Sequence, residues 1–380
     1  MADMLKIGIL KEVKNLWEKR APLTPDDVKW LVDRGVGVEV ESSRLRVFSD
    51  EEYRQAGASI VDRPPSASVL VGIKEPPIES LLEGRTYMLF SHTVKGQAHN
   101  MPLLREFLKR KDTLIDYEKI TDESGRRLVF FGRFAGICGM VDSLHYMGRR
   151  MRSKGEDSPF GSLEPAWKYP SLEELKAQLR RVSARIKKEG LPAGYAPFIA
   201  GVTGCGNVSR GAHEVLAELD AVEIAPGELE AFMQKGAYSD KKLYKVALFR
   251  EDKVRSKSGR PFTFEEYLEH PDRFMSNLDR YLSHFNVLVH TSYWDKRYPR
   301  LVPKSMVKRL FGQDNFRLEL IGDISCDVEG SIEVTDRSTS PDEAVFTYLP
   351  ESDSYVDGCE ADGITVLAVD NLPAELPRDS

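Results

Sequence analysis

Pro197-Phe-Ile-Ala-Gly-Val-Thr-Gly-Cys-Gly-Asn-Val-Ser-Arg-Gly-Ala212 is the stretch of sequence that decides the fold. Its apolar first part predicts a buried strand, and the amphipathic pattern of residues 212–219 predicts a helix after the glycines. Glycine allows a tight turn and a close approach of backbone to pyrophosphate, and the helix N-terminus supplies free N–H groups. Because Ser209 stands where the third glycine of G-x-G-x-x-G would be, a glycine-rich turn that serves packing alone is the alternative at this point.

The bulk composition is that of a globular protein long enough for two domains. Of its 380 residues, 41% are hydrophobic and 30% are charged. No apolar run approaches the ~20 residues that span a bilayer, and a net charge of −6 with interspersed signs argues against nucleic-acid partners. The 4 cysteines lie far apart without metal-ligand spacing. We therefore expect no disulfide framework, no metal site, no membrane partner and a reducing cytoplasm.

Short apolar runs alternate with helical patterns through the first 130 residues and again after Pro197. This alternation predicts mostly parallel sheets covered by helices. We expect an α/β protein of two Rossmann-like domains, residues 1–134 and 135–370, with a cleft between them. The second domain is the dinucleotide-binding one, and its polar stretch 236–282 is interpreted as an insertion.

A basic cluster lies within that polar stretch. It comprises Lys241, Lys242, Lys245, Lys253, Arg255 and Lys257. A solvated loop or helix face is the favoured interpretation, and a phosphate-binding surface is the alternative.

Polar side chains follow the strands predicted in the N-terminal half. Lys74, His92 and Glu118 each come directly after a predicted strand, and Arg20 lies in the loop before the first predicted helix. Ligands gather at the carboxyl ends of strands in open α/β sheets. Each residue also has a plainer interpretation: a solvated lysine, a structural histidine, or an arginine paired with Glu18. Taken together, they favour a site for an anionic substrate with acid–base chemistry.

Several motifs resemble a known family. Four segments look like the N-terminal domain that alanine dehydrogenase, the transhydrogenase nucleotide subunit and saccharopine-forming enzymes share. They are Lys19-Arg-Ala-Pro-Leu-Thr-Pro25, Ile73-Lys-Glu-Pro-Pro77, Ser91-His-Thr-Val-Lys-Gly-Gln97 and Ile115-Asp-Tyr-Glu118. Segments similar to lysine–ketoglutarate reductase, the lysine-linked saccharopine dehydrogenase, are Phe130-Phe-Gly-Arg-Phe-Ala-Gly136, Gly204–Ala212, Ser292-Tyr-Trp294, Gly322-Asp-Ile-Ser-Cys-Asp327 and Val369-Asp-Asn-Leu-Pro373. The likeness runs nearly end to end.

This resemblance implies that lysine and 2-oxoglutarate are joined reductively into saccharopine, or that saccharopine is split, with a nicotinamide cofactor. It also implies that Lys74 and His92 are the acid–base pair. His92 would handle protons at the secondary amine, and Lys74 would act in carbinolamine formation and collapse. A lysine acts as a base near neutral pH only if its pKa falls from about 10.4. Arg20 would lower that pKa, whereas Glu75 and Glu118 would raise it.

The other residues implied by the resemblance form two groups. The implied substrate contacts are Arg20, Gln97, Glu118, Phe131, Asp323 and Ser325. The implied cofactor contacts are Arg126, Gly204, Gly206, Asn207, Val208, Ser209, Tyr293, Asp370, Asn371 and Leu372. Saccharopine carries three carboxylates, and the planar fork of an arginine suits one of them.

The identity of the cofactor is expected from the strand that follows the glycine-rich helix. An NAD site usually carries an Asp or Glu about 20 residues after its glycines. The corresponding strand end, residues 222–226, has no acid at its tip. We therefore expect NADP(H) rather than NAD(H), although no nearby arginine marks a phosphate pocket.

The end of the chain departs from the family pattern. The resemblance implies a helix after Asn371-Leu-Pro373 that returns to the N-terminal domain, so residues 371–380 are expected to begin that return. The chain is interpreted as a fragment, an excised module or a shortened enzyme. For a fragment, the expected partner is a C-terminal, glutamate-forming saccharopine dehydrogenase module, and the location becomes mitochondrial.

Two other functions stay open at this point. Alanine dehydrogenase shares Lys74, His92 and Arg20, but the stretch 236–282 and Ser292-Tyr-Trp294 disfavour it. A catalytically silent nucleotide-binding module is the alternative outside the enzymes. A transhydrogenase-like coupling subunit is disfavoured, because nothing indicates a membrane partner.

Overall fold

The computed structural model describes residues 5–94, 96 and 98–380, and the chain divides into two compact units. Unit 1 comprises the chain up to Phe131 together with Pro377–Ser380, and unit 2 comprises Gly132–Leu376. The observed boundary precedes the expected one at 134/135, because a long helix that belongs to unit 2 begins at Gly132. The cleft expected between the two units stays a prediction.

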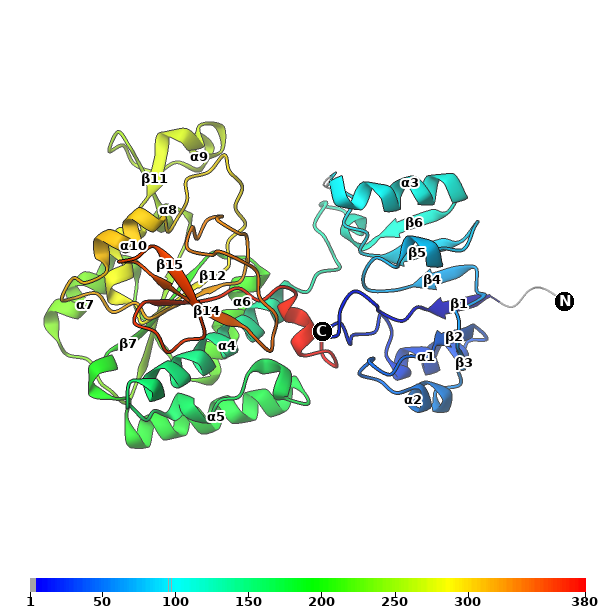
Figure 1. Cartoon of the computed structure of the whole chain (residues 1–380), viewed down its shortest axis with the longest axis horizontal. Coiled ribbons are helices and arrows are strands. Elements are labelled where there is room, and N and C mark those ends of the chain that lie inside the picture. The colour runs from blue at the N-terminus through cyan, green and yellow to red at the C-terminus, as the bar shows by residue number, and fades with distance from the viewer. Residues whose placement is uncertain (1–4, 95, 97) are drawn as a thin grey trace. The chain divides into compact units, whose positions relative to one another are not determined.

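Unit 1 is a six-stranded parallel sheet in the order β3-β2-β1-β4-β5-β6 (Figure 1). The strands are β1 (Lys6–Ile9), β2 (Gly37–Glu41), β3 (Ser59–Val61), β4 (Val69–Val71), β5 (Thr86–Leu89) and β6 (Thr113–Asp116). The helices are α1 (Pro25–Val32), α2 (Asp50–Gln55) and α3 (Met101–Arg110). Every strand pair is parallel, so the predicted doubly wound α/β architecture is confirmed.

Unit 2 contains an eight-stranded sheet in the order β15-β14-β16-β13-β12-β7-β9-β8. Its strands are β7 (Phe198–Thr203), β8 (Val222–Glu223), β9 (Leu243–Leu248), β12 (Val287–His290), β13 (Leu320–Asp323), β14 (Val345–Leu349), β15 (Ser354–Asp357) and β16 (Ile364–Leu367). A separate hairpin pairs β10 (Val254–Ser256) with β11 (Phe274–Ser276). The helices are α4 (Gly132–Ser153), α5 (Leu172–Glu189), α6 (Asn207–Glu218), α7 (Leu229–Lys235), α8 (Arg250–Lys253), α9 (Phe264–Glu269) and α10 (Lys304–Leu310).

The stretch 236–282 is not wholly an insertion, and that expectation was wrong for its first part. β9 lies inside this stretch, pairs with β7 along six residues and is buried in the sheet. The flanking lysines and Lys245 within the strand give the segment a polar average, which hides its apolar positions. The antiparallel hairpin β14–β15 is also an addition to the expected parallel sheet.

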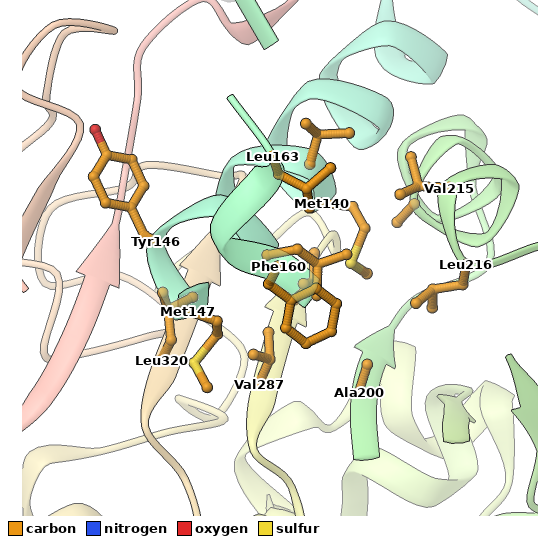
Figure 2. Packing of buried hydrophobic residues seen from close by; sticks show 14 of the residues in the cluster. Met140, Tyr146, Met147, Phe160, Leu163, Ala200, Val215, Leu216, Val287 and Leu320 are labelled. Carbon is orange, nitrogen blue, oxygen red and sulfur yellow. The ribbon is translucent and has the colours of Figure 1, made fainter. Parts of the chain in front are cut away.

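The core of unit 2 lies on both faces of its sheet. α4, α5 and α6 cover one face, and Figure 2 shows Met147 of α4 beside Leu320 and Val287 of the strands. The other face is covered by the β10–β11 hairpin and α10. Within the described residues, no helix is long and apolar enough to cross a membrane.

The C-terminal segment belongs mainly to unit 2. A 3-10 helix, η11 (Leu372–Glu375), packs on α4, so only Pro377–Ser380 group with unit 1. Of residues 371–380, which were expected to return to the N-terminal domain, residues 371–376 thus group with unit 2.

This packing places two buried carboxyl groups against each other, Asp142 of α4 and Glu375 of η11. Burial raises the pKa of both groups. The charge and the hydrogen bond of Asp142 raise the pKa of Glu375 further, whereas the hydrogen bond with Glu375 lowers that of Asp142. The folded unit therefore holds a proton here that the unfolded chain releases near pH 4. The stabilisation that comes from this bound proton is present at low pH. It is lost as the pH rises through the raised pKa values that the two carboxyl groups have in the folded unit.

We expect Glu375→Gln to raise the free energy of unfolding at pH 8 by about 1–3 kcal/mol, because it removes one of the two acids. Thermal unfolding followed by circular dichroism from pH 5 to pH 8 checks this, and the variant should lose the decline with pH. The exposed Glu343→Gln is the matched control and should behave like the parent chain. A Glu375→Gln protein less stable than the parent at every pH would contradict the shared proton.

Candidate active-site residues in the two units

The acid–base candidates of unit 1 lie at the carboxyl ends of neighbouring strands. Lys74 follows β4, His92 follows β5, and Glu118 lies in a 3-10 helix directly after β6. These strands are adjacent and parallel, so the three positions share one edge of the sheet. The predicted placement at strand ends is therefore what the structure shows.

His92 is oriented by a carboxylate that follows Lys74 in the chain. Its Nδ1 lies 2.9 Å from Oε2 of Glu75, and the backbone of His92 adopts a left-handed φ of 53°. Burial alone would raise the pKa of Glu75, but its hydrogen bond with His92 and the ion pair with Lys14 lower that pKa to about 2. Glu75 is therefore ionised at neutral pH and fixes the histidine ring.

The pKa of Lys74 is lowered, although charges of both signs lie around it. Burial is the largest cause, and the positive charges of Arg20 and Lys14 add to it. Glu18 and Glu75 act in the opposite direction but are outweighed. This is the direction that a lysine base near neutral pH requires.

Arg20 is buried and already paired within unit 1. Its Nε and Nη2 each donate to a carboxylate oxygen of Glu18 at 2.7 Å, and its guanidinium lies 4.4 Å from the ring centroid of Phe131. The plainer interpretation of this arginine, a pair with Glu18, is thus what the structure shows. Binding of a substrate carboxylate by Arg20 stays a prediction and would have to coexist with that pair.

Glu12 is a site residue that sequence reasoning missed. Its carboxylate accepts hydrogen bonds from the backbone N–H groups of Ile73 at 2.6 Å and Lys74 at 3.0 Å. Burial raises its pKa to about 7. Its partners lie some sixty residues away in the chain, and no local pattern marks them.

The other predicted residues of unit 1 make contacts at its surface. Glu118 pairs with Arg127 at 3.0 Å, and Arg126 pairs with Asp122 at 2.8 Å. Gln97 lies outside the described residues. Their contacts with substrate or cofactor stay predictions.

The glycine-rich turn of unit 2 has the predicted strand–turn–helix form. β7 ends at Thr203, and Gly204 takes a left-handed φ of 98° that favours glycine. The N–H of Gly204 donates to the carbonyl of Leu248 at 2.9 Å, which ties the turn to β9. Gly206 caps α6, and no atom lies within 4 Å of where its Cβ would be.

The first turn of α6 has the features that suit a dinucleotide phosphate. Asn207, Val208 and Ser209 are its first three residues, and Gly206 makes no side-chain capping bond. The first N–H groups of a helix are available to an anion, and the missing Cβ of Gly206 leaves room for it. The residues present therefore fit the diphosphate of a dinucleotide.

Close contact between two helices holds this turn in place. A Cβ on Gly136 of α4 would overlap the carbonyl oxygen of Val208, and a Cβ on Gly211 of α6 would overlap that of Arg133. The two backbones therefore touch, which fixes α6 against α4. Ser209, the departure from the glycine pattern, is buried in α6.

The ends of β7, β12 and β13 bring three polar residues into one row. His290 is in register with Thr203 on one side and Asp323 on the other. Asp323 accepts hydrogen bonds from the hydroxyls of Ser325 at 2.7 Å and Thr335 at 2.6 Å. Burial raises the pKa of Asp323 to about 6.

Of the remaining predicted cofactor residues, three lie in loops of unit 2 and Leu372 begins η11. Tyr293 follows β12 and is exposed, Asp370 donates its N–H to Thr339, and Asn371 adopts a left-handed φ of 63° before the buried Leu372. Among the described residues, no cluster of His, Cys, Asp or Glu could hold a metal ion.

The strand order changes where a nucleotide ribose contact is expected. β8 lies at the edge of the sheet, whereas β9 lies beside β7. In a Rossmann fold, the ribose is expected at the tip of the strand that follows the glycine-rich helix and pairs with the glycine strand. Here β9, and not β8 with residues 222–226, is the first strand after α6 that pairs with β7, so the relevant tip is that of β9. The exposed Arg250 lies there, two residues after Leu248, with its guanidinium 4.5 Å from the ring centroid of Phe264.

Comparison with known proteins confirms the resemblance. Residues 8–138 match the family described as alanine dehydrogenase/PNT, N-terminal domain. The α-aminoadipic semialdehyde synthase of Arabidopsis thaliana is 36% identical over 98% of this chain and 37% of its own length. The mitochondrial enzyme of Bos taurus is 33% identical over 98% of this chain and 42% of its own. The chain thus spans about two fifths of the length of these relatives.

More distant similarities agree in fold. Saccharopine dehydrogenase [NAD(+), L-lysine-forming] of Candida glabrata is 29% identical over 67% of this chain and 68% of its own length. A solved L-alanine dehydrogenase covers 98% of this chain and 84% of its own, with a TM-score of 0.57 and 19% identity. The transhydrogenase of Sinorhizobium meliloti covers 98% and 88%, with a TM-score of 0.54 and 15% identity. The dehydrogenase homologues imply a nicotinamide dinucleotide cofactor, without distinguishing NADP from NAD.

Two glycine variants should separate packing from ligand binding in unit 2. We expect Gly211→Ala to destabilise the unit by about 1–3 kcal/mol, because its Cβ overlaps backbone. Gly206→Ala should fold normally but bind a dinucleotide at least about tenfold more weakly, because its methyl group occupies the space next to the diphosphate. Thermal unfolding and fluorescence titration with NADPH and NADH measure both effects. Unchanged affinity in the Gly206→Ala protein would remove this turn from the binding site.

Proposed function

We propose that this chain, whose residues 8–138 belong to the alanine dehydrogenase/PNT N-terminal domain family, is an oxidoreductase that joins L-lysine and 2-oxoglutarate into saccharopine, or catalyses the reverse. Homology to the α-aminoadipic semialdehyde synthases over 98% of the chain carries the proposal. The name of the Candida glabrata relative, a lysine-forming saccharopine dehydrogenase, supports the same chemistry. The acid–base residues at the strand ends of unit 1 match what that chemistry requires.

The carbon–nitrogen bond is formed in two stages, and each needs proton transfer. The ε-amine of lysine first adds to the ketone of 2-oxoglutarate, and the carbinolamine then loses water to give an imine. Lys74 suits the first stage, because burial lowers its pKa, which is the direction that a lysine base requires. The nicotinamide cofactor supplies the hydride that reduces the imine.

His92 suits the proton transfer at the secondary amine. When Nδ1–H donates to the Glu75 carboxylate, Nε2 is left as the free acceptor on the other side of the ring. The ring orientation is then fixed by a carboxylate that is ionised at neutral pH. This division of labour assigns Lys74 to the oxygen of the carbinolamine and His92 to the nitrogen.

We further propose that NADP(H) is the preferred cofactor. The expectation from sequence rested on residues 222–226, which the sheet order removes from the ribose position. The tip of β9 carries Arg250, which suits a 2′-phosphate and supports NADP(H). Glu251 and Asp252 follow it directly, and an acid there is what an NAD site usually carries. The saccharopine dehydrogenases similar to this chain carry NAD(+) in their names, so the preference has to be measured.

The partner and the location remain predictions. The greater length of the α-aminoadipic semialdehyde synthases supports a further module, and a glutamate-forming saccharopine dehydrogenase is the proposed one. The bovine relative is named as mitochondrial, whereas a cytoplasmic location was expected from the cysteines. Tandem affinity capture and fractionation from the source cells would test each of them.

Lysine and 2-oxoglutarate together should oxidise NADPH, and either substrate alone should not. We expect Lys74→Ala and His92→Ala each to lower kcat by about 10²–10⁴, with little change in dinucleotide affinity. The assay is the loss of nicotinamide absorbance, with saccharopine identified by mass spectrometry. Lys29→Ala is the control, since that lysine is exposed on α1. Turnover of ammonia and pyruvate instead would favour alanine dehydrogenase, and full activity in both variants would remove the assigned pair.

Arg250→Ala should lower the affinity for NADPH by about tenfold or more and leave that for NADH unchanged, because only NADPH carries the 2′-phosphate. Isothermal titration with both dinucleotides measures the ratio. Arg260→Ala, another exposed arginine of the same stretch, should not alter it. An equal loss for both dinucleotides would place Arg250 elsewhere on the ligand.

A further inference from the structure

A buried lysine in unit 2 lacks the acidic partner that the other buried cations have. The cationic residues buried within the described chain are Arg20, Arg46, Arg150 and Lys253. Each of the three arginines forms an ion pair with a carboxylate. Lys253 is 8% exposed and forms no ion pair with any described residue; its Nζ donates to the hydroxyl of Ser292 at 2.6 Å. A buried charge without a counter-charge is costly.

The lysine nitrogen lies beside the glycine-rich turn. Ser292 follows β12, the parallel neighbour of β7. A Cβ built on Gly204 would lie 3.0 Å from the hydroxyl oxygen of Ser292. Lys253 is the last residue of α8, just beyond the tip of β9, so its side chain reaches from one neighbour of β7 to the other. One hydroxyl group therefore separates the ammonium from the turn.

The groups that face Lys253 keep it largely protonated at neutral pH. Burial lowers its pKa to about 8, and the charge of Arg250 acts in the same direction. Cys205 of the turn and the acids Asp252 and Glu251 of α8 raise it. Asp252 accepts a hydrogen bond from the N–H of Phe249 at 2.9 Å, so its carboxylate is engaged in capping α8.

His290 is a further ionisable group near this lysine. It is fully buried on β12, and its Nδ1 lies 2.9 Å from the hydroxyl of Thr203. Burial, with the charge of Lys253, lowers the pKa of His290 to about 3, so it is neutral at physiological pH. Asp252 and Glu251 thus act on the lysine through their charge, but no carboxylate of a described residue forms an ion pair with its ammonium group.

We propose that Lys253 binds the diphosphate of the nicotinamide dinucleotide, which supplies the anionic partner that the chain does not. The inference rests on the cofactor of the proposed function. The position between β7 and β12 favours the diphosphate, because dinucleotide diphosphates lie at the carboxyl end of the glycine strand. The 2′-phosphate is assigned to the exposed Arg250 at the tip of β9. Phosphate binding was the alternative interpretation of the basic cluster in the sequence, and we assign it to Lys253, the one buried lysine of that cluster.

Lys253→Met should weaken NADH and NADPH alike by about ten- to a hundredfold, because both carry the diphosphate and the lost bond is charge-assisted. Titration calorimetry on the full chain measures both affinities. Lys245→Met is the matched control: that lysine of β9 is half-buried but pairs with Glu223 at 3.1 Å, and its loss should not change binding. Loss of affinity for NADPH alone would overturn the assignment to the diphosphate.

Stability without ligand separates a binding role from a structural one. The ligand-free Lys253→Met protein should melt at the same temperature as the parent or higher, because an unpaired buried charge is gone. A lower melting temperature together with unchanged affinity would show that the lysine serves packing, and would overturn the inference. If the parent chain binds neither dinucleotide, the proposed cofactor and this inference both fail. Saccharopine turnover with normal affinity in Lys253→Met would refute the inference alone.

A pH series provides a readout that does not depend on folding of the variant. Diphosphate binding favours the protonated lysine, so the affinity of the parent for NADH should fall as the pH rises above about 8. A Cys205→Ser background removes the thiol of the turn, whose charge acts on Lys253. Lys253→Arg, which keeps its charge throughout, should bind without this pH dependence. An affinity for NADH that is constant from pH 6.5 to pH 9.5 in the Cys205→Ser protein would overturn the proposal.

Discussion

The contact between the backbones of α4 and α6 is the constraint on which unit 2 depends. No side chain separates the helices at Gly136 and Gly211, so the axis of α6 is fixed against the longest helix of the unit. Its first turn is thereby held at the end of β7, while Gly204 is tied to β9 through Leu248. Backbone contacts within the unit thus set the position of the turn, and a rigid support of this kind is what a preorganised binding turn requires.

In unit 1, charged side chains at the ends of the strands fix the positions of the acid–base candidates. Glu75 has two effects there: it orients His92, and its negative charge opposes the lowering of the Lys74 pKa. Glu12 holds the backbone N–H of Lys74 and so fixes where that side chain begins. Because burial still dominates at Lys74, the base keeps a lowered pKa although acids surround it. The strand ends thus fix where Lys74 and His92 lie, and burial lowers the pKa of Lys74.

The sequence predicted those features whose causes are local. The turn after β7 follows from an apolar run and glycines within sixteen residues, and Lys74 and His92 follow from the ends of short apolar runs. β9 was missed because the lysines around it mask a strand that only its neighbours bury. The exchange of β8 and β9 in the sheet has no local signal, and so the tip beside the ribose position was assigned to the wrong strand. Glu12 was missed for the same reason, since its partners are distant in the chain.

The buried charges show how far residue type alone can mislead. From sequence, Arg20 was expected to bind an anion, whereas Lys253 was expected to be solvated. In the folded chain Arg20 has its carboxylate in Glu18, while Lys253 has only a hydroxyl. A fold that only had to be stable would gain by replacing that lysine with an apolar residue of similar size. A buried charge that lacks a partner in the chain therefore indicates a ligand more strongly than one whose charge is already balanced.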